Sequence, residues 1–269
     1  MKKATQKKLF APCHMSEDEY RNHPAVNKST LWVLQKSPLH YQYACENPSQ
    51  DTQALKMGRA IHEAVLQPEE YKTHYVAAPD VDRRTKEGKE LYAEFLFAAG
   101  DKEILTASEY QEVSRIASAV WECKEAEELL TGCTMEKPLF WTHEDTGIEC
   151  KCRVDAMRPG IMIDLKTSSD ASTSAFSRDV FRYGYDVQAA HYVDGYHSFC
   201  GEFPSWFFIV VEKTAPYAVN VLHTDAGIID YGFLRRDALL QRLKECRDSG
   251  IWEGYGKNEL ILPGYLEVE

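Results

Sequence analysis

The feature that most constrains the fold is a β-hairpin pattern near the middle of the chain. Apolar and polar residues alternate over 148–156, as expected for a strand with one buried face. Turn formers at 158–160 follow, and the apolar stretch 161–167 predicts a second strand. Cys150 and Cys152 share the apolar face, so we expect both thiols to pack in the core rather than to bind metal.

Flanking segments extend this hairpin into a larger sheet. The continuous apolar run at 206–211 predicts a buried central strand. Helical spacing of apolar residues predicts amphipathic helices, of which the longest covers 107–130. The predicted strands are 135–141, 148–156, 161–167, 206–211 and 218–223, and the predicted helices are 29–35, 51–67, 107–130, 184–199 and 228–247. This order predicts an α/β fold with a mixed central β-sheet flanked by helices.

The sequence has no internal repeat and no low-complexity linker, so we expect one domain over 1–269. Its predicted parts are an N-terminal arm at 1–28, a mainly helical part at 29–130 and an α/β core at 131–269. Pro38 and Pro68 are predicted to end the first two helices. Residues 79–89 predict a polar, basic loop.

Charge and hydropathy exclude several classes of protein. No apolar run approaches the roughly 18 residues that cross a bilayer, and the basic N-terminus lacks the apolar stretch of a signal peptide. We therefore expect a cytoplasmic protein with no membrane contact. The net charge of −11 argues mildly against a general nucleic-acid binder. Basic residues nevertheless cluster at 2–8, at 83–89, and at Lys151 with Arg153. The eight cysteines contain no Cys-x-x-Cys pair, so a structural zinc site is not expected.

Two carboxylates and a lysine in the hairpin indicate chemistry. Asp164 and Lys166 are two residues apart on a strand and project to the same face. The tight turn brings Asp155 beside Asp164, and two adjacent carboxylates repel unless a cation such as Mg²⁺ lies between them. The lysine could orient a water or offset charge in a phosphoryl-transfer transition state. The alternative is a surface hairpin with solvated charges, because an isolated Asp-x-Lys is common by chance.

Four further polar residues are candidates for the same site. Gln188 and Tyr192 are four apart on a predicted helix and share one face. His62 interrupts an otherwise apolar helix, and Glu136 lies in the strand before the hairpin. Taken singly, such a histidine is more often a core residue, and such a glutamate is usually solvated.

Taken together and in order, these residues resemble the RecB-like PD-(D/E)XK nuclease family. The pattern comprises Gly58-x-x-x-His62, Glu136, Val154-Asp155, Asp164-Leu165-Lys166-Thr167 and Gln188-x-x-x-Tyr192. The resemblance is greater to its RecE-type (exonuclease VIII) nuclease domains. The similar stretches are MGRAIHEAVLQPEEY, VDRRTKEGKE, EKPLFW, CRVDAM, IDLKTS and YDVQAAHYVDGY. Their joint occurrence favours a functional role for His62 and Glu136 over the structural alternatives.

The resemblance implies a role for each residue. A site for Mg²⁺, with Mn²⁺ as a substitute, would be formed by His62, Glu136, Asp155, Asp164 and the backbone carbonyl of Leu165. Lys166 would activate water, and Gln188 and Tyr192 would position the site and the DNA strand. The basic residues that could contact DNA are Arg83, Arg84, Lys89, Lys151 and Arg153.

The implied activity is 5′→3′ exonuclease action on linear double-stranded DNA, producing 3′ single-stranded tails for recombination. Relatives act at double-stranded DNA ends as homo-oligomeric rings, so a trimer or tetramer is expected. They work beside a single-strand annealing recombination protein, in a bacterial or phage-infected cytoplasm. No GxxxxGK[ST] motif occurs, so no ATP is expected. Only Cys200 and Cys246 follow the nuclease core, so no iron–sulfur cluster is expected.

Three alternatives remain open at this level. The first is a structure-specific or single-strand DNA endonuclease of the same fold, because polarity depends on the shape of the DNA channel. The second is a catalytically silent DNA-end-binding module, which would have no need of Asp155, Asp164 and Lys166 together. The third is a metal-binding structural domain, which the lack of a zinc-type motif disfavours.

Overall fold

The computed structural model describes residues 15–47 and 52–256. At its centre is a five-stranded sheet in the order β3-β4-β5-β6-β7. The strands are β3 (Thr134–Thr142), β4 (Glu149–Arg158), β5 (Ile161–Ser168), β6 (Ser205–Glu212) and β7 (Val219–His223). β5 and β6 are parallel, whereas the other neighbouring pairs are antiparallel. The predicted mixed α/β fold is therefore confirmed.

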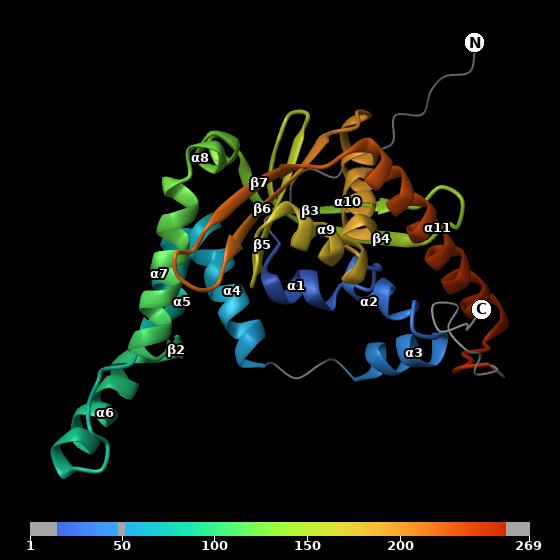
Figure 1. Ribbon diagram of the computed structural model, residues 1–269. Coiled ribbons are helices and arrows are strands. Elements are labelled where there is room, and N and C mark those ends of the chain that lie inside the picture. The colour runs from blue at the N-terminus through green and yellow to red at the C-terminus, as the bar shows by residue number, and fades with distance from the viewer. Residues whose placement is uncertain (1–14, 48–51, 257–269) are drawn as a thin grey trace, which may run out of the picture.

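Helices cover both faces of this sheet (Figure 1). One face packs against α2 (Lys28–Val33), α3 (Pro38–Glu46), α9 (Thr173–Arg182), α10 (Tyr185–Cys200) and α11 (Ala226–Ser249). The other packs against α4 (Gln53–Leu66), α5 (Pro68–His74), α7 (Ala107–Glu122) and α8 (Lys124–Leu130). Trp206 and Phe208 of β6 point to the first layer, and Ile209 and Val211 point to the second. The apolar run at 206–211 is thus buried on both faces, as predicted.

The strands β4 and β5 separate next to Asp155 and Asp164, two of the predicted site residues. Their pairing ends at Ala156 and Ile163, one residue short of Asp155 and Asp164. The first part of β4 pairs instead with Val26, whose amide donates to the Glu149 carbonyl at 2.8 Å. The segment after α1 (Glu17–Asn22) therefore fills the space that β5 leaves.

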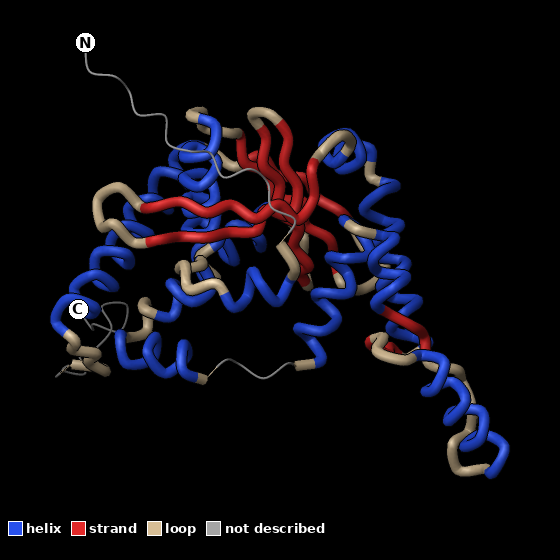
Figure 2. The backbone as a smooth tube through the Cα atoms, turned by 180° about the vertical axis from the view of Figure 1, so that it is seen from behind, coloured by secondary structure: helices blue, strands red, loops and turns tan. Residues whose placement is uncertain are grey.

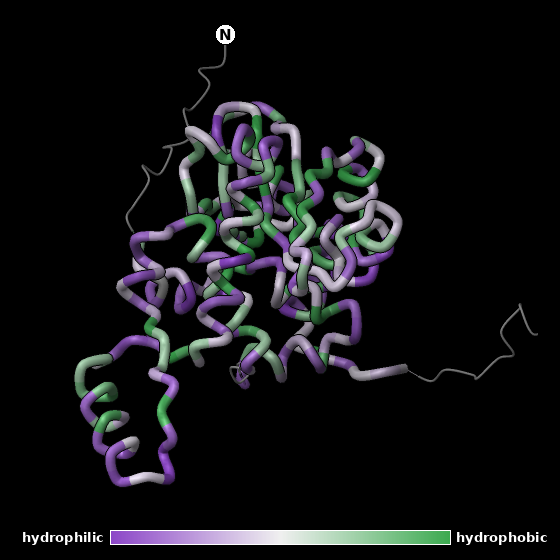
Figure 3. Tube along the Cα trace, turned by 60° about the vertical axis from the view of Figure 1, so that its left-hand side comes forward, coloured by the Kyte–Doolittle hydropathy of each residue, from purple (hydrophilic) through white to green (hydrophobic). Residues whose placement is uncertain are grey.

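An arm projects from the body between α5 and α7 (Figure 2). The parallel strands β1 (Tyr75–Ala77) and β2 (Glu103–Leu105) form its base, and α6 (Lys86–Ala99) is its helix. Figure 3 shows hydrophobic residues along this arm, outside the core. The predicted loop at 79–89 is wrong in its last part, because the Thr85 hydroxyl accepts a bond from the Gly88 amide at 3.0 Å and starts α6.

Other predicted boundaries also need correction. The helix predicted at 107–130 is two helices, because Cys123 is extended (φ −75°, ψ 108°) and separates α7 from α8. Pro38 and Pro68 do end the preceding helices, but each also occupies the first turn of a new helix. Ser16 caps α1 within the segment predicted to be an N-terminal arm.

Two further predictions concern the ends of the chain and the membrane. The basic cluster at 2–8 and Cys13 lie outside the described residues. Among the helices that the structure describes, none is long and apolar enough to cross a membrane.

Candidate active site

The separation of β4 and β5 creates the site. In place of a backbone partner, the Asp155 carboxylate accepts a hydrogen bond from the Leu165 amide at 2.8 Å. On the other side of β4, Glu136 lies opposite Asp155, between the register pairs Met135–Ala156 and Lys137–Val154. Three acids from adjacent strands, Glu136, Asp155 and Asp164, therefore meet at one end of the β4–β5 ladder.

His62 joins this group from α4. Its Nδ1 atom lies 3.6 Å from Oδ2 of Asp155. Ile61 and Val65 anchor α4 in the core beneath the sheet, which directs His62 toward the strands. One potential ligand atom each from His62, Glu136 and Asp155 lies within 4.8 Å of the other two. Carboxylate oxygens suit Mg²⁺ and Mn²⁺, and imidazole suits Mn²⁺ and later metals, so this donor set fits a divalent cation.

The electrostatics of Glu136 support that fit. Burial, reinforced by the charges of Asp155 and Glu63, raises its pKa to about 9. Its backbone has φ of 50°, a conformation that side-chain-bearing residues seldom adopt. At neutral pH the metal-free protein keeps a proton in this crowded cluster, which a divalent cation could replace.

Asp164 occupies the adjoining, fully enclosed position. Its carboxylate is only 1% exposed, accepts a hydrogen bond from Gln188 Nε2 and pairs with the Lys166 ammonium. Burial, opposed by Lys166 and reinforced by Asp155, raises the pKa of Asp164 to about 6. At pH 7 and above, Asp164 therefore carries its charge while remaining sensitive to its neighbours.

Lys166 retains its proton in this setting. Burial alone would lower its pKa, but the charges of Asp164 and Asp155 outweigh burial and raise the pKa. The ammonium also lies 4.9 Å from the centroid of the Tyr185 ring, a cation–π distance. A charged ammonium can orient water and offset developing charge, but it cannot accept a proton.

Two predicted residues lie at the margins of this arrangement. Tyr192 packs edge-on against Trp206, with ring centroids 5.7 Å apart. Burial, together with nearby Tyr20, Cys152 and the site carboxylates, holds the pKa of its hydroxyl well above the usual range. The Leu165 side chain is buried in the core and its amide binds Asp155. The metal-binding role of its carbonyl stays a prediction.

Two basic residues of β4 face the N-terminal segment instead of open solvent. The Lys151 ammonium is buried and donates to the backbone carbonyls of Tyr20 and His23, the latter at 2.8 Å. We therefore leave Lys151 out of the proposed DNA contacts. Arg153 lies over the Tyr20 ring at 4.3 Å and keeps partial exposure.

The remaining basic residues, Arg83, Arg84 and Lys89, are exposed on the projecting arm and do not join the site. Arg84 binds both carboxylate oxygens of Asp82, at 2.9 and 3.0 Å, which partly neutralises it. Arg83 lies 4.7 Å from the Tyr92 ring. Any contact of these residues with DNA would be far from the carboxylates.

Two residues near Lys166, Tyr185 and Lys28, were not predicted from the sequence. Tyr185 precedes Gln188 by three positions on α10, so helical spacing could have indicated it. The Lys28 ammonium lies 5.6 Å from the centroid of the Tyr185 ring and donates to the Tyr183 carbonyl at 2.7 Å. Burial, together with the charge of Lys166, lowers the pKa of Lys28 to about 7. No sequence signal distinguishes this lysine from a surface residue.

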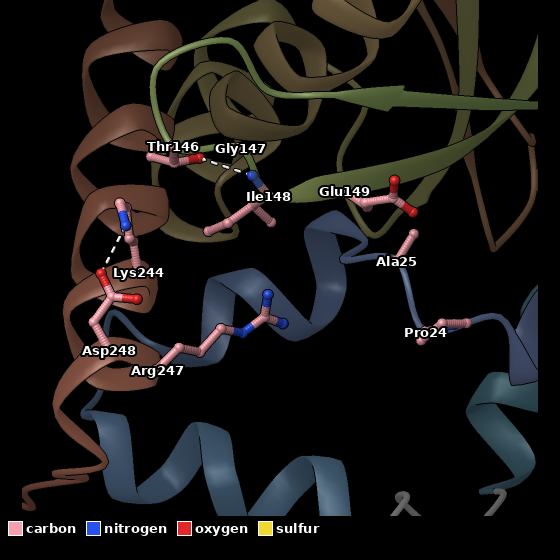
Figure 4. A pocket seen from close by; sticks show the side chains of 9 residues that line it. All are labelled: Pro24, Ala25, Thr146, Gly147, Ile148, Glu149, Lys244, Arg247 and Asp248. Carbon is pink, nitrogen blue, oxygen red and sulfur yellow. Dashed lines mark hydrogen bonds and ion pairs between the residues drawn. The ribbon is translucent and has the colours of Figure 1, made fainter.

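A surface cavity of about 440 Å³ lies elsewhere (Figure 4). It is formed between the β3–β4 loop, the Pro24 segment and the C-terminal half of α11, and its charged walls include Glu149 and Arg247. Glu149 precedes Asp155 by six residues along β4, a separation of roughly 20 Å. The cavity is thus distinct from the carboxylate cluster.

Comparisons with known proteins agree with the fold. A crystal structure of a protein from Eubacterium rectale, described as a candidate exonuclease, is similar with a TM-score of 0.64 and 14% identity, over 89% of this chain and 88% of that one. At that identity the likeness shows the fold. An alkaline exonuclease from Laribacter hongkongensis has 15% identity over 71% of this chain and 97% of that one, but its TM-score of 0.26 supports no argument. No curated protein sequence matches the chain significantly.

The family is shown by sequence. Residues 28–261 match the model of the family described as "PDDEXK-like domain of unknown function (DUF3799)". This match spans the central sheet, the carboxylate cluster and the helices on both faces. The chain therefore belongs to this family of PDDEXK-like domains.

Proposed function

We propose that this protein is a Mg²⁺-dependent, ATP-independent 5′→3′ exonuclease that acts on the ends of linear double-stranded DNA. The observation that carries the proposal is the convergence of His62, Glu136 and Asp155 beside the buried Asp164–Lys166 pair. Family membership and the name of the Eubacterium rectale protein support a nuclease. The RecE-type resemblance supports the polarity and the recombination role.

The proposed chemistry is phosphodiester hydrolysis. His62, Glu136, Asp155 and Asp164, with the Leu165 carbonyl, would hold the divalent cation, which supplies Lewis-acid activation of the scissile phosphate and of water. The protonated Lys166 would offset charge on the phosphate in the transition state. Gln188 would hold Asp164 in place through its hydrogen bond. The intact Asp164–Lys166 pair disfavours a silent end-binding module.

We further propose that the protein works as a homo-oligomeric ring, a trimer or tetramer. A nuclease that follows one strand for many steps benefits from enclosing the duplex, and closed symmetry is common among oligomers. The projecting arm supplies a surface for such contact, because Phe97 on α6 is 92% exposed. Arg83, Arg84 and Lys89 on the same arm could contact the DNA backbone. An annealing protein remains a proposed partner on resemblance alone.

The test is incubation with end-labelled linear duplex and with closed circular duplex, in Mg²⁺ without ATP. We expect progressive shortening of the linear DNA from 5′ ends and no cleavage of the circle. Asp164→Asn retains the shape of the side chain and should reduce the rate by at least about 10³-fold, roughly 4 kcal/mol in the barrier. Nicking of the circle would favour the endonuclease alternative, and full activity of Asp164→Asn would refute the site.

A further inference from the structure

Three exposed aromatic rings form a strip beside the active site. Phe181 is 41% exposed, Tyr183 is 45% exposed and Tyr231 is 50% exposed. Phe181 is the last residue but one of α9, Tyr183 begins the short link to α10, and Tyr231 lies on α11. Large aromatic side chains normally contribute most by burial, so three exposed rings on adjoining segments indicate a binding surface.

Ring contacts connect Tyr183 to the proposed reaction centre. The ring centroids of Tyr183 and Tyr185 are 5.8 Å apart, and the Lys166 ammonium lies 4.9 Å from the Tyr185 centroid. Phe181 meets Tyr231 edge-on, with centroids 5.9 Å apart. Tyr183 therefore lies one ring away from Lys166, and Phe181 and Tyr231 form a second ring pair on α9 and α11.

Cationic groups accompany the rings. The exposed Arg182 guanidinium lies 5.3 Å from the Tyr183 ring. Arg235 lies 5.7 Å from the Tyr231 ring and 4.7 Å from that of Trp32, and the buried Asp186 fixes it at 2.7 Å. Alternating rings and cations are the composition that binds single-stranded nucleic acid, in which bases stack on rings and phosphates meet positive charge.

The link between α9 and α10 has a fixed conformation that keeps the strip in place. Gly184 has φ of 66°, and a Cβ atom there would come within 2.7 Å of the Trp32 ring. Lys28 donates to the Tyr183 carbonyl on the same link. Tyr183 is thus an exposed ring on a rigid backbone, which lowers the entropy lost when a base stacks on it.

We propose that Phe181, Tyr183 and Tyr231, with Arg182, bind the unpaired bases of the DNA strand whose phosphate lies at Asp164 and Lys166. This assignment rests on the proposed function for the identity of the strand. The contact of Tyr183 with Lys166 through the Tyr185 ring, together with Arg182 beside Tyr183, favours a nucleic-acid strand over a protein partner. Stacking accepts every base, so the strip would add affinity for unpaired DNA without sequence preference.

The test compares two fluorescent oligomers by anisotropy, with wild-type protein in EDTA so that the probe stays intact. One is oligothymidylate of about ten nucleotides, and the other is an abasic oligomer of equal length and charge. We expect tighter binding of the oligomer that has bases. The variant Tyr183→Ala/Tyr231→Ala should bind oligothymidylate at least roughly 10-fold more weakly, whereas Tyr183→Phe/Tyr231→Phe should bind within about twofold of wild type. Phe203→Ala is the control, because Phe203 is exposed beyond the far end of α10.

Each outcome decides the proposal. Equal binding of both oligomers by wild type, undetectable binding of oligothymidylate, or unchanged binding by the double alanine variant would overturn it. The oligomer comparison needs no variant, so misfolding of the alanine protein does not remove the test. Unchanged DNA binding with a lower sedimentation mass would assign the strip to contact between copies instead. Base-dependent binding without cleavage of any duplex in Mg²⁺ would refute the proposed function and leave the strip standing.

Discussion

Replacing Glu136 by glutamine should stabilise the metal-free protein. The gain in free energy of unfolding over wild type should be larger at neutral pH than at acidic pH. The carboxyl has a pKa near 9 in the folded protein, against an ordinary value of 4.5. Between these values the folded chain holds a proton that the unfolded chain has released. The contribution of Glu136 to wild-type stability therefore falls as pH rises, by up to about 1.4 kcal/mol per pH unit. Glutamine carries no proton to lose, so this loss is absent in the variant.

Over two pH units, the difference in free energy of unfolding between Glu136→Gln and wild type should grow by about 3 kcal/mol, a large part of the stability of an ordinary domain. Urea denaturation in EDTA at pH 5, 6 and 7 would measure it as a widening gap between Glu136→Gln and wild type. Glu144→Gln, in the exposed β3–β4 loop, is the matched control and should show no widening. Mg²⁺ should stabilise wild type more than Glu136→Gln, since the cation takes the place of the proton. Parallel stability curves for the variant and wild type would refute the reasoning.

Three further predictions concern chemistry, DNA contact and assembly. Lys166→Ala should abolish cleavage while leaving duplex binding in a filter assay nearly intact. Lys166→Arg should not restore activity, because a guanidinium is larger and differently shaped. Equal loss of binding and cleavage would show that Lys166 only binds a phosphate of the substrate. Arg83→Ala/Arg84→Ala should weaken duplex binding and reduce the slope of log affinity against log salt by up to about 2, and an unchanged slope would show that this part of the arm does not touch DNA. Sedimentation should give a multiple of 30.8 kDa that Phe97→Glu lowers and Phe203→Glu does not; a strict monomer for wild type would reject the ring.

The sheet was predictable because its strands have simple patterns. Alternation placed Cys150 and Cys152 in the core, and the apolar run at 206–211 placed β6 in the interior of the sheet. The helix boundaries were harder to predict, because proline has two different effects on local structure. Pro38 and Pro68 both block continuation of a helix and favour the first turn of the next one, and the sequence analysis recognised only the first effect.

The site was predictable in its residue types but not in its surroundings. The strand spacing of Asp164 and Lys166 required them to share a face, and their ion pair shows that they do. Lys151 has the same spacing relative to Arg153 and was predicted to contact DNA. It is buried because a segment more than 120 residues away in sequence, ending at Val26, packs alongside β4. Local periodicity carries no information about such a distant partner.

The hydrogen bond between Asp155 and the Leu165 amide would let one side chain serve both the fold and the proposed metal site. It fastens two strands at the place where their backbones no longer reach each other, and it does so with an oxygen that would also face the cation. The hydrogen bond requires an oxygen acceptor at this position, whereas the proposed metal contact also requires a negative charge. Asparagine could keep the strands fastened without the charge, whereas glutamate would keep the charge on a longer side chain that displaces the strand contact. Shape and reactivity are thus separable at a single residue, and tolerance to substitution there would reveal which of the two is the more demanding.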